Sequence, residues 1–348
     1  MSVFQPFTGM PGVGTEKIAK HRTVAADGYL QFLPGGVILD GSKTRDPLNP
    51  DYPTDTTGQL RLRAGLLLGK ITSSGKYANA VIGNTAGALT GTGTSLTLAA
   101  AEAVELVRRV GATGTFKLTG PPSAAGVVRT LTATYSAVNT TTGVVTITAL
   151  GVNEVQTVNL VTAGTGGSIR LIVQKTDGTY ALTPAAAWSA TDATLLSNLN
   201  TALDTATGVV GGIVATAIAA TDTDLGFVLT YSGTGYAGNT WALAQVHTLF
   251  TSNTGSNVVR TTTGVPGAFV AGSLAQPTDG SETVQSFLPD GWELYVPQDS
   301  TDLPLDKFPI EGNVNAANLL PWPADSSLKQ WVRDSLNTYG KFVFTEKY

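Results

Sequence analysis

The sequence predicts an α+β fold that is mainly β. Hydrophobic residues make up 42% of the 348 residues and charged residues only 13%, with 40 glycines. A composition rich in Thr, Val and Gly is typical of short strands joined by turns, not of a disordered chain. Most segments alternate apolar and polar residues with the period of a strand, and only three show helical spacing.

Charge and composition argue against several classes of partner. A formal net charge of -4 does not indicate the clustered Lys and Arg of a nucleic-acid groove. The chain has no cysteine, so disulfides and thiolate metal sites are excluded. The longest nearly apolar run, 209–220, is shorter than the roughly 20 residues of a membrane span, and no targeting segment is visible. We therefore expect a protein made in the cytoplasm, with neither nucleic acid nor membrane as partner.

Residues 1–57 are predicted to form an extended N-terminal arm. Six prolines and many glycines leave no sustained periodicity, so this segment cannot bury a core by itself. Two interpretations remain open: a disordered tail, or an arm that becomes ordered when it adds a strand to a partner. The aromatic residues Phe4, Phe7, Tyr29 and Phe32 favour the arm, because solvating tails are poor in aromatics.

The stretch 58–80 is predicted to be the first part of a small core. From Leu60 to Ala78 it reads LRLRAGLLLGKITSSGKYA, with leucines before Gly69-Lys70 and a Ser-Ser-Gly-Lys turn after them. This pattern is typical of two short strands that meet at a bend.

Residues 81–152 are predicted to form a first β-rich module with one helix. Helical spacing over 98–110 places Ala103 and Leu106 on one face, and Gly111 ends the helix. Four charged residues are expected on the opposite face: Glu102, Glu105, Arg108 and Arg109. Strands are expected at 115–118, 128–135 and 144–150.

Residues 153–275 are predicted to form a second β-rich module, again with one helix. The helix begins at Ser189, where a capping pattern occurs, and presents a stripe of leucines before Gly208. Strands are expected at 155–161, 169–174, 213–219, 227–231 and 240–249.

Residues 276–348 are predicted to be the second part of the core. Asp279-Gly280 marks a turn before an apolar strand region. A loop then ends in Leu320-Pro-Trp-Pro323, and a short helix follows it. Gly340 ends that helix, and the chain closes on an apolar strand.

The two core segments resemble the head decoration (capsid-cementing) proteins of lambda-type bacteriophages. RAG-x-LLGKIT-x-SGKY is similar to the opening core segment of that family. Asp279-Gly280, Gly312-x-Val314, Leu320–Pro323 and the final Gly340-Lys-Phe-Val-Phe follow in the family's order, with Pro321 as a departure from its pattern. The resemblance covers about a third of the chain. It implies one decoration-type core, 58–80 plus 276–348, with 81–275 inserted into a surface loop, where long insertions cost little.

The resemblance further implies a non-enzymatic virion structural protein without cofactor or metal. It would bind the major capsid protein on the outer surface of a phage head, as an oligomer that in this family is a homotrimer, and stabilise the head. The candidate capsid-binding residues are Phe4, Phe7, Tyr29 and Phe32. The candidates for core or oligomer contacts are Leu67, Gly69, Lys70, Trp322, Pro323 and Trp331. Trp322 is expected to be largely buried, either within the core or at a subunit contact.

A second class of function remains open. The chain could be a host-surface or carbohydrate-binding adhesin or tail fibre protein, with the Thr-rich inserted modules binding a host-surface glycan. A glycan hydrolase ranks behind both, because no paired acidic constellation stands out. The two histidines, His21 and His247, lie in different regions without metal-ligand spacing. The acidic stretch 299–306 is better interpreted as a solvated loop than as a cation site.

Overall fold

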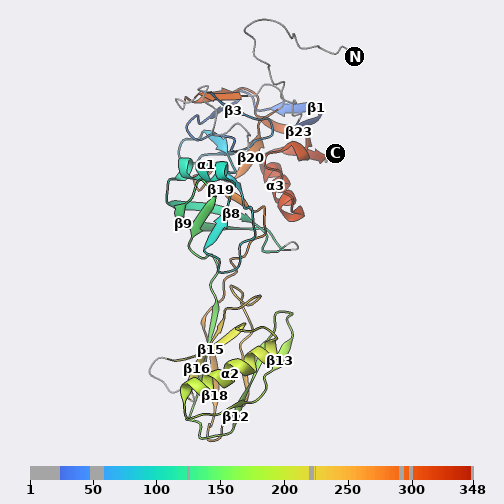
Figure 1. Ribbon diagram of the computed structural model, residues 1–348. Helices are drawn as coiled ribbons and strands as arrows, with labels where there is room; N and C mark the ends of the chain where they lie inside the picture. Colours follow the sequence, from blue (N-terminus) through green and yellow to red (C-terminus); the bar gives the residue numbers. More distant parts are fainter. Residues whose placement is uncertain are drawn as a thin grey trace, which may run out of the picture.

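The computed structural model describes residues 24–47, 59–123, 126–218, 223, 225–289, 294–297 and 301–345. About 40% of the described residues lie in strands and 15% in three α-helices, which confirms the mainly β prediction. Figure 1 shows a larger and a smaller lobe joined by a narrow neck. We call the two parts of the larger lobe the core and the proximal module, and the smaller lobe the distal domain.

The core brings together strands from opposite ends of the sequence. Its main sheet has the order β20-β4-β5-β2-β22. These strands are β20 (Val284–Phe287), β4 (Leu67–Lys70), β5 (Tyr77–Asn79), β2 (Val37–Leu39) and β22 (Leu303–Leu305). β4 and β20 are antiparallel, with Leu67 opposite Phe287 and Gly69 opposite Val284. The segments 58–80 and 276–348 therefore share one hydrogen-bonded sheet.

A second sheet of the core packs with the C-terminal helix. It has the order β1-β23-β24, and the pair β3-β21 lies apart from it. The elements are β1 (Ala25–Phe32), β23 (Pro309–Asn315), β24 (Lys341–Thr345), the 3-10 helix η1 (Ala316–Asn318), α3 (Ser326–Tyr339), β3 (Gln59–Leu62) and β21 (Leu294–Pro297). Asp325 starts α3, since its Oδ1 accepts the Leu328 N–H at 3.0 Å. One apolar cluster unites β4, β20, α3 and β24 and includes Leu67, Val284, Phe287, Leu328, Val332, Leu336 and Phe342.

Part of the predicted N-terminal arm belongs to the core. β1 pairs with β23 and β2 pairs with β22, and Val24 and Leu39 are fully buried. The structure thus differs from the predicted extended arm over 24–47. The segment has no core of its own, but the strands that complete its hydrogen bonds come from the C-terminal part of the same chain. Residues 1–23 and 48–58 lie outside the described residues.

The proximal module is a six-stranded sheet with one helix. Its order is β6-β19-β8-β9-β10-β7. The elements are β6 (Gly83–Asn84), β19 (Leu274–Gln276), β8 (Gly114–Gly120), β9 (Arg129–Val138), β10 (Val144–Ile147), β7 (Ser95–Thr97) and α1 (Ala100–Val110). Phe269 and Ala275 lie in this module's own apolar cluster. The stretch 265–275, predicted for the second module, therefore packs with the first, because the chain returns through it toward the core.

The distal domain, residues 153–264, has a separate core between two sheets and a helix. One sheet has the order β15-β16-β11-β18, and in the other β12 pairs with β13, β14 and β17. The elements are β11 (Glu154–Leu160), β12 (Ser168–Gln174), β13 (Tyr180–Leu182), β14 (Ala186–Ala187), α2 (Asp192–Thr207), β15 (Ile213–Ala217), β16 (Gly226–Tyr231), β17 (Gln245–Thr248) and β18 (Ser256–Thr262). Leu195, Leu199 and Leu203 of α2 lie in the domain's apolar cluster, as the predicted leucine stripe requires.

The neck consists of two chain segments whose backbones approach closely. Val152 and Val265 exchange two backbone hydrogen bonds of 3.0 and 2.9 Å. A Cβ on Gly151 would lie 2.0 Å from the Gly91 carbonyl oxygen, and one on Gly267 would lie 2.1 Å from the Gly151 nitrogen. Glycine is thus needed at these positions for the proximal module to contact the neck directly.

Gly69 provides a test of the joined core. A Cβ at this position would lie 1.9 Å from the Ser281 carbonyl oxygen and 2.6 Å from that of Thr283. Gly69→Ala should therefore lower the free energy of unfolding by about 1–3 kcal/mol, as measured by chemical denaturation. Gly87→Ala is the matched control, because a Cβ there meets nothing within 4 Å. Equal stability of both variants would contradict the close approach of β4 to the 281–283 turn.

Candidate functional site

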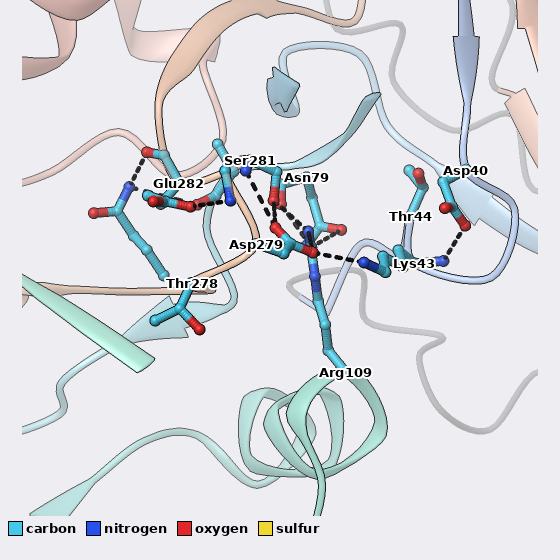
Figure 2. Close-up of polar contacts among 12 residues, drawn as sticks. Asp40, Lys43, Thr44, Asn79, Arg109, Thr278, Asp279, Ser281 and Glu282 are labelled. Carbon is cyan, nitrogen blue, oxygen red and sulfur yellow. Dashed lines mark hydrogen bonds and ion pairs between the residues drawn. The ribbon is translucent and has the colours of Figure 1, made fainter. Parts of the chain in front are cut away.

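A buried polar cluster joins the proximal module to the core (Figure 2). Arg109, at the end of α1, donates from Nη1 to the Asn79 carbonyl oxygen at 2.7 Å and to Asn79 Oδ1 at 2.9 Å. Its Nη2 donates to Ser281 Oγ at 2.5 Å and lies 3.5 Å from Asp279 Oδ2. Lys43 Nζ approaches the same Asp279 oxygen at 3.0 Å. Four separate chain segments therefore meet at one guanidinium group and one carboxylate.

The electrostatics of this cluster keep Asp279 charged. Burial by itself raises the pKa of this carboxyl, but the Arg109 charge and hydrogen bonds from Ser281 and Lys43 outweigh burial and lower the pKa to about 2. Burial lowers the pKa of Arg109, and the nearby carboxylates of Asp279 and Glu105 oppose that shift. The Arg109 side chain is only 1% exposed. Near neutral pH both groups stay ionised, so the arrangement suits attachment of α1 rather than proton transfer.

The charged face of α1, opposite its apolar stripe, is largely covered in the structure. Glu102 and Glu105 are 3% and 0% exposed, and Arg109 points into the polar cluster. Each buried carboxylate has a local donor: the Ala99 N–H lies 2.9 Å from Glu102 Oε2, and Arg108 Nη2 lies 2.6 Å from Glu105 Oε1. α1 packs on the sheet of the proximal module and also against the core, so more than one of its faces is buried. The apolar stripe of the helix alone does not indicate this second contact.

Lys117 and Arg108 add further contacts across the same boundary. Lys117 on β8 pairs with Glu282 at 2.7 Å, and Arg108 Nη2 donates to the Lys43 carbonyl oxygen at 3.0 Å. The proximal module is therefore held to the core by charged groups on both a helix and a strand.

The candidate capsid-binding residues that the structure describes lie on β1. Tyr29 is 50% exposed and Phe32 is partly buried, while Phe4 and Phe7 lie outside the described residues. The Gln31 amide contacts the Tyr29 hydroxyl, so both side chains lie on one side of the strand.

This side of the β1-β23-β24 sheet is exposed. Gln31, Glu311 and Lys341 are directly paired across the three strands, and Val343, two residues further along β24, is 62% exposed. The other side of the sheet packs on the core through Phe342, which is 5% exposed. We define the outer face as Tyr29, Gln31, Glu311, Lys341 and Val343. It combines apolar side chains with charges of both signs.

The residues predicted for core or oligomer contacts mostly gather in one place. Leu67, Trp322 and Trp331 belong to or pack against the same apolar cluster. Gly69 and Pro323 are buried, and Lys70 is exposed.

Trp322 is only partly buried within the single chain, so burial in the core alone is incomplete and the predicted alternative of a subunit contact stays a prediction. Its ring lies 5.8 Å from Lys329 Nζ and 5.5 Å from Arg333 Cζ. Two cations of α3 thus lie over the ring, which also packs against the apolar cluster of the core.

The histidine and acidic residues considered from the sequence form no common site in the described part of the chain. His247 is exposed on β17 beside Thr248, and His21 is not described. Asp302 accepts from Lys76 Nζ at 2.5 Å, and that hydrogen bond lowers its pKa. Within the described ranges, no group of three or more His, Asp or Glu residues has a geometry that could hold a metal ion.

The contacts of the polar cluster were not predicted from the sequence. The Asp279-Gly280 turn and the arginines at the end of the first helix were both noted, but nothing local indicates that they meet. Their pairing depends on the return of the chain to the core after the insertion.

The sequence matches no family model and no curated protein. Among the described residues, no helix has the length and apolar character needed to cross a membrane.

The low pKa of Asp279 predicts a specific dependence of stability on pH. Because the folded state lowers the pKa from 3.8 to about 2, the charged carboxylate stabilises the fold above about pH 4, and this contribution is lost as the pH falls toward 2. Asp279→Asn should reduce the free energy of unfolding at pH 7 by about 1–3 kcal/mol and should lose less stability than the wild type between pH 4 and 2.

Urea denaturation at a series of pH values measures both effects. Asp306→Asn, which changes an exposed carboxylate of the core, is the control. An Asp279→Asn variant with wild-type stability at pH 7 would contradict the proposed role of the cluster.

Proposed function

We propose that this protein is a non-enzymatic virion structural protein that binds the outer surface of a phage head and stabilises it. One observation carries the proposal: the two segments that resemble decoration proteins pack into a single core although a long insertion separates them. β4 pairs with β20, and Leu66 also bridges to Leu320 in the Leu-Pro-Trp-Pro loop. A resemblance that arose by chance in unrelated segments would not require them to be neighbours in space.

The geometry of the insertion supports the same proposal. The Ile82 N–H donates to the Ala275 carbonyl oxygen at 2.8 Å, so the chain leaves the core and returns to it at adjacent points. Between these points the chain forms the proximal module beside the core and then reaches through the neck to the distal domain (Figure 1). An insertion of this kind adds a projecting part without rearranging the small core.

The outer face is the surface that we propose for capsid binding. Figure 1 places β1 and β23 at the end of the molecule away from the distal domain. Tyr29 and Val343 offer apolar area, and the neighbouring Glu311 and Lys341 offer charges of both signs, a combination typical of interfaces that form between separately folded proteins. Binding as an oligomer, for which the homotrimer of the resembled family is our proposal, would add avidity to a modest affinity for each site.

The first test removes the distal domain. Because Val152 and Val265 are hydrogen-bonded partners, a short Gly-Ser turn can replace 153–264 without displacing either neighbour. We expect this variant to sediment with heads assembled from the major capsid protein of the same phage as efficiently as the full chain. Loss of binding on this deletion, in a variant that remains folded, would place the capsid contact in the distal domain.

The second test places a charge on the outer face. Val343→Glu should weaken binding to the same heads at least about tenfold, because an unpaired carboxylate would be buried in the interface. Leu243→Glu is the matched control, since Leu243 is 42% exposed on the distal domain. Equal binding of the two variants would exclude the outer face as the capsid contact.

A further inference from the structure

Two loops of the distal domain lie at the end farthest from the neck. β11 and β18 run from the neck end of the domain to the opposite end. Val155 is paired with Thr262 at the neck end, and Leu160 is paired with Ser256 at the opposite end. The loop after β11, residues 161–167, and the loop before β18, residues 250–255, therefore meet at the tip. We call them the tip loops.

The tip loops are rich in hydroxyl groups and carry no charge. Their sequences are VTAGTGG and FTSNTG. Thr162 Oγ1 donates to the Ser252 carbonyl oxygen at 2.6 Å and accepts from the Thr254 N–H at 3.0 Å. Thr165 Oγ1 and Ser252 Oγ lie 2.7 Å apart. Each hydroxyl offers one donor and two acceptor positions. An exposed hydroxyl that makes one or two hydrogen bonds within the loops can therefore make a further hydrogen bond to a ligand.

The backbone of the second tip loop is under strain. Ser252 has a φ of 74°, and it is the only non-glycine residue with a positive φ among those that the structure describes. The adjacent Asn253 holds its Oδ1 atom buried without a hydrogen-bond partner. A non-glycine residue held at a positive φ is a form of backbone strain that clusters at functional loops, and it is this strain that draws attention to the second tip loop.

An aromatic side chain lies beside the first tip loop. The backbone N–H of Trp188 donates to the Gly167 carbonyl oxygen at 2.9 Å. A Cβ on Gly164 would lie 3.0 Å from Trp188 Cδ1, so the loop backbone lies directly against the indole ring. Trp188 packs against the apolar cluster of the distal domain and is only partly buried, so it places an aromatic side chain at the edge of this polar, uncharged surface.

We propose that the tip loops bind a neutral saccharide. Serine, threonine and asparagine side chains can both donate hydrogen bonds to sugar hydroxyls and accept them, and an indole ring packs against the C–H face of a pyranose. The absence of charged residues from both loops favours uncharged sugars over sialylated or sulfated ones. This activity goes beyond attachment to a capsid and uses the end of the molecule away from the outer face.

Ser252→Gly is the most informative variant. Glycine adopts a positive φ without strain, so the variant should fold at least as well as the wild type while losing the Ser252 hydroxyl. Thr165→Ala removes the other partner of the same contact. Thr205→Ala is the matched control, because Thr205 is exposed near the end of α2, away from the tip loops.

The full chain and the three variants are tested for binding to an array of defined neutral, sialylated and sulfated oligosaccharides. The dissociation constant for each neutral oligosaccharide that binds is then measured by titration. We expect the wild type and Thr205→Ala to bind a subset of neutral glycans. Ser252→Gly and Thr165→Ala should bind the same glycans about fivefold or more weakly, the effect of one lost hydrogen bond.

Three results would overturn the proposal. They are no binding to any neutral glycan at millimolar concentration, binding restricted to acidic glycans, or equal affinity of the tip variants and the control. Binding to capsids by the same proteins is a separate measurement, so failure at the tip leaves the proposed head attachment standing, and the reverse also holds.

Discussion

The pairing of β4 with β20 is the constraint on which the rest of the structure depends. Leu67 and Leu68 are fully buried, and Gly69 lies against the carbonyl oxygens of the 281–283 turn. β4 and β20 lie on either side of the long insertion in the sequence, so the two strands can pair only after the whole insertion has been synthesised. This pairing then positions α3 and β24, and β24 completes the β1-β23-β24 sheet, in which the N-terminal strand β1 pairs with β23. Such long-range pairing carries a cost in loop-closure entropy, but that cost grows only slowly with the length of the insertion.

The two inserted parts are attached to the core in different ways. Arg109 and Lys117 hold the proximal module to the core through ion pairs with Asp279 and Glu282. The distal domain has its own apolar cluster and reaches the rest of the molecule through a neck of closely packed glycine backbone. A projecting domain that packs independently can vary in its surface loops without disturbing the capsid-binding end, which agrees with the division of roles that we propose.

Local patterns in the sequence predicted the local structure well. The three helices and the turn at Asp279-Gly280 followed from helical spacing and from turn residues. Long-range contacts were harder to predict. The strands of 24–47 were interpreted as an arm because the residues that complete their sheets lie beyond position 300. Helical spacing placed Glu102, Glu105 and Arg109 opposite the apolar stripe of the first helix but did not predict their burial, because the surface that covers them comes from other segments. Burial of a charged residue depends on what packs against it, and spacing within one helix does not contain that information.

The most direct test of the central claim is a cryo-EM map of phage heads carrying this protein. We predict density on the outer surface at three-fold positions, with the β1-β23-β24 sheet against the capsid and the distal domain pointing away from it. A map in which the distal domain contacts the capsid, or in which decorated and undecorated heads are indistinguishable, would contradict the proposal that this chain is a head decoration protein.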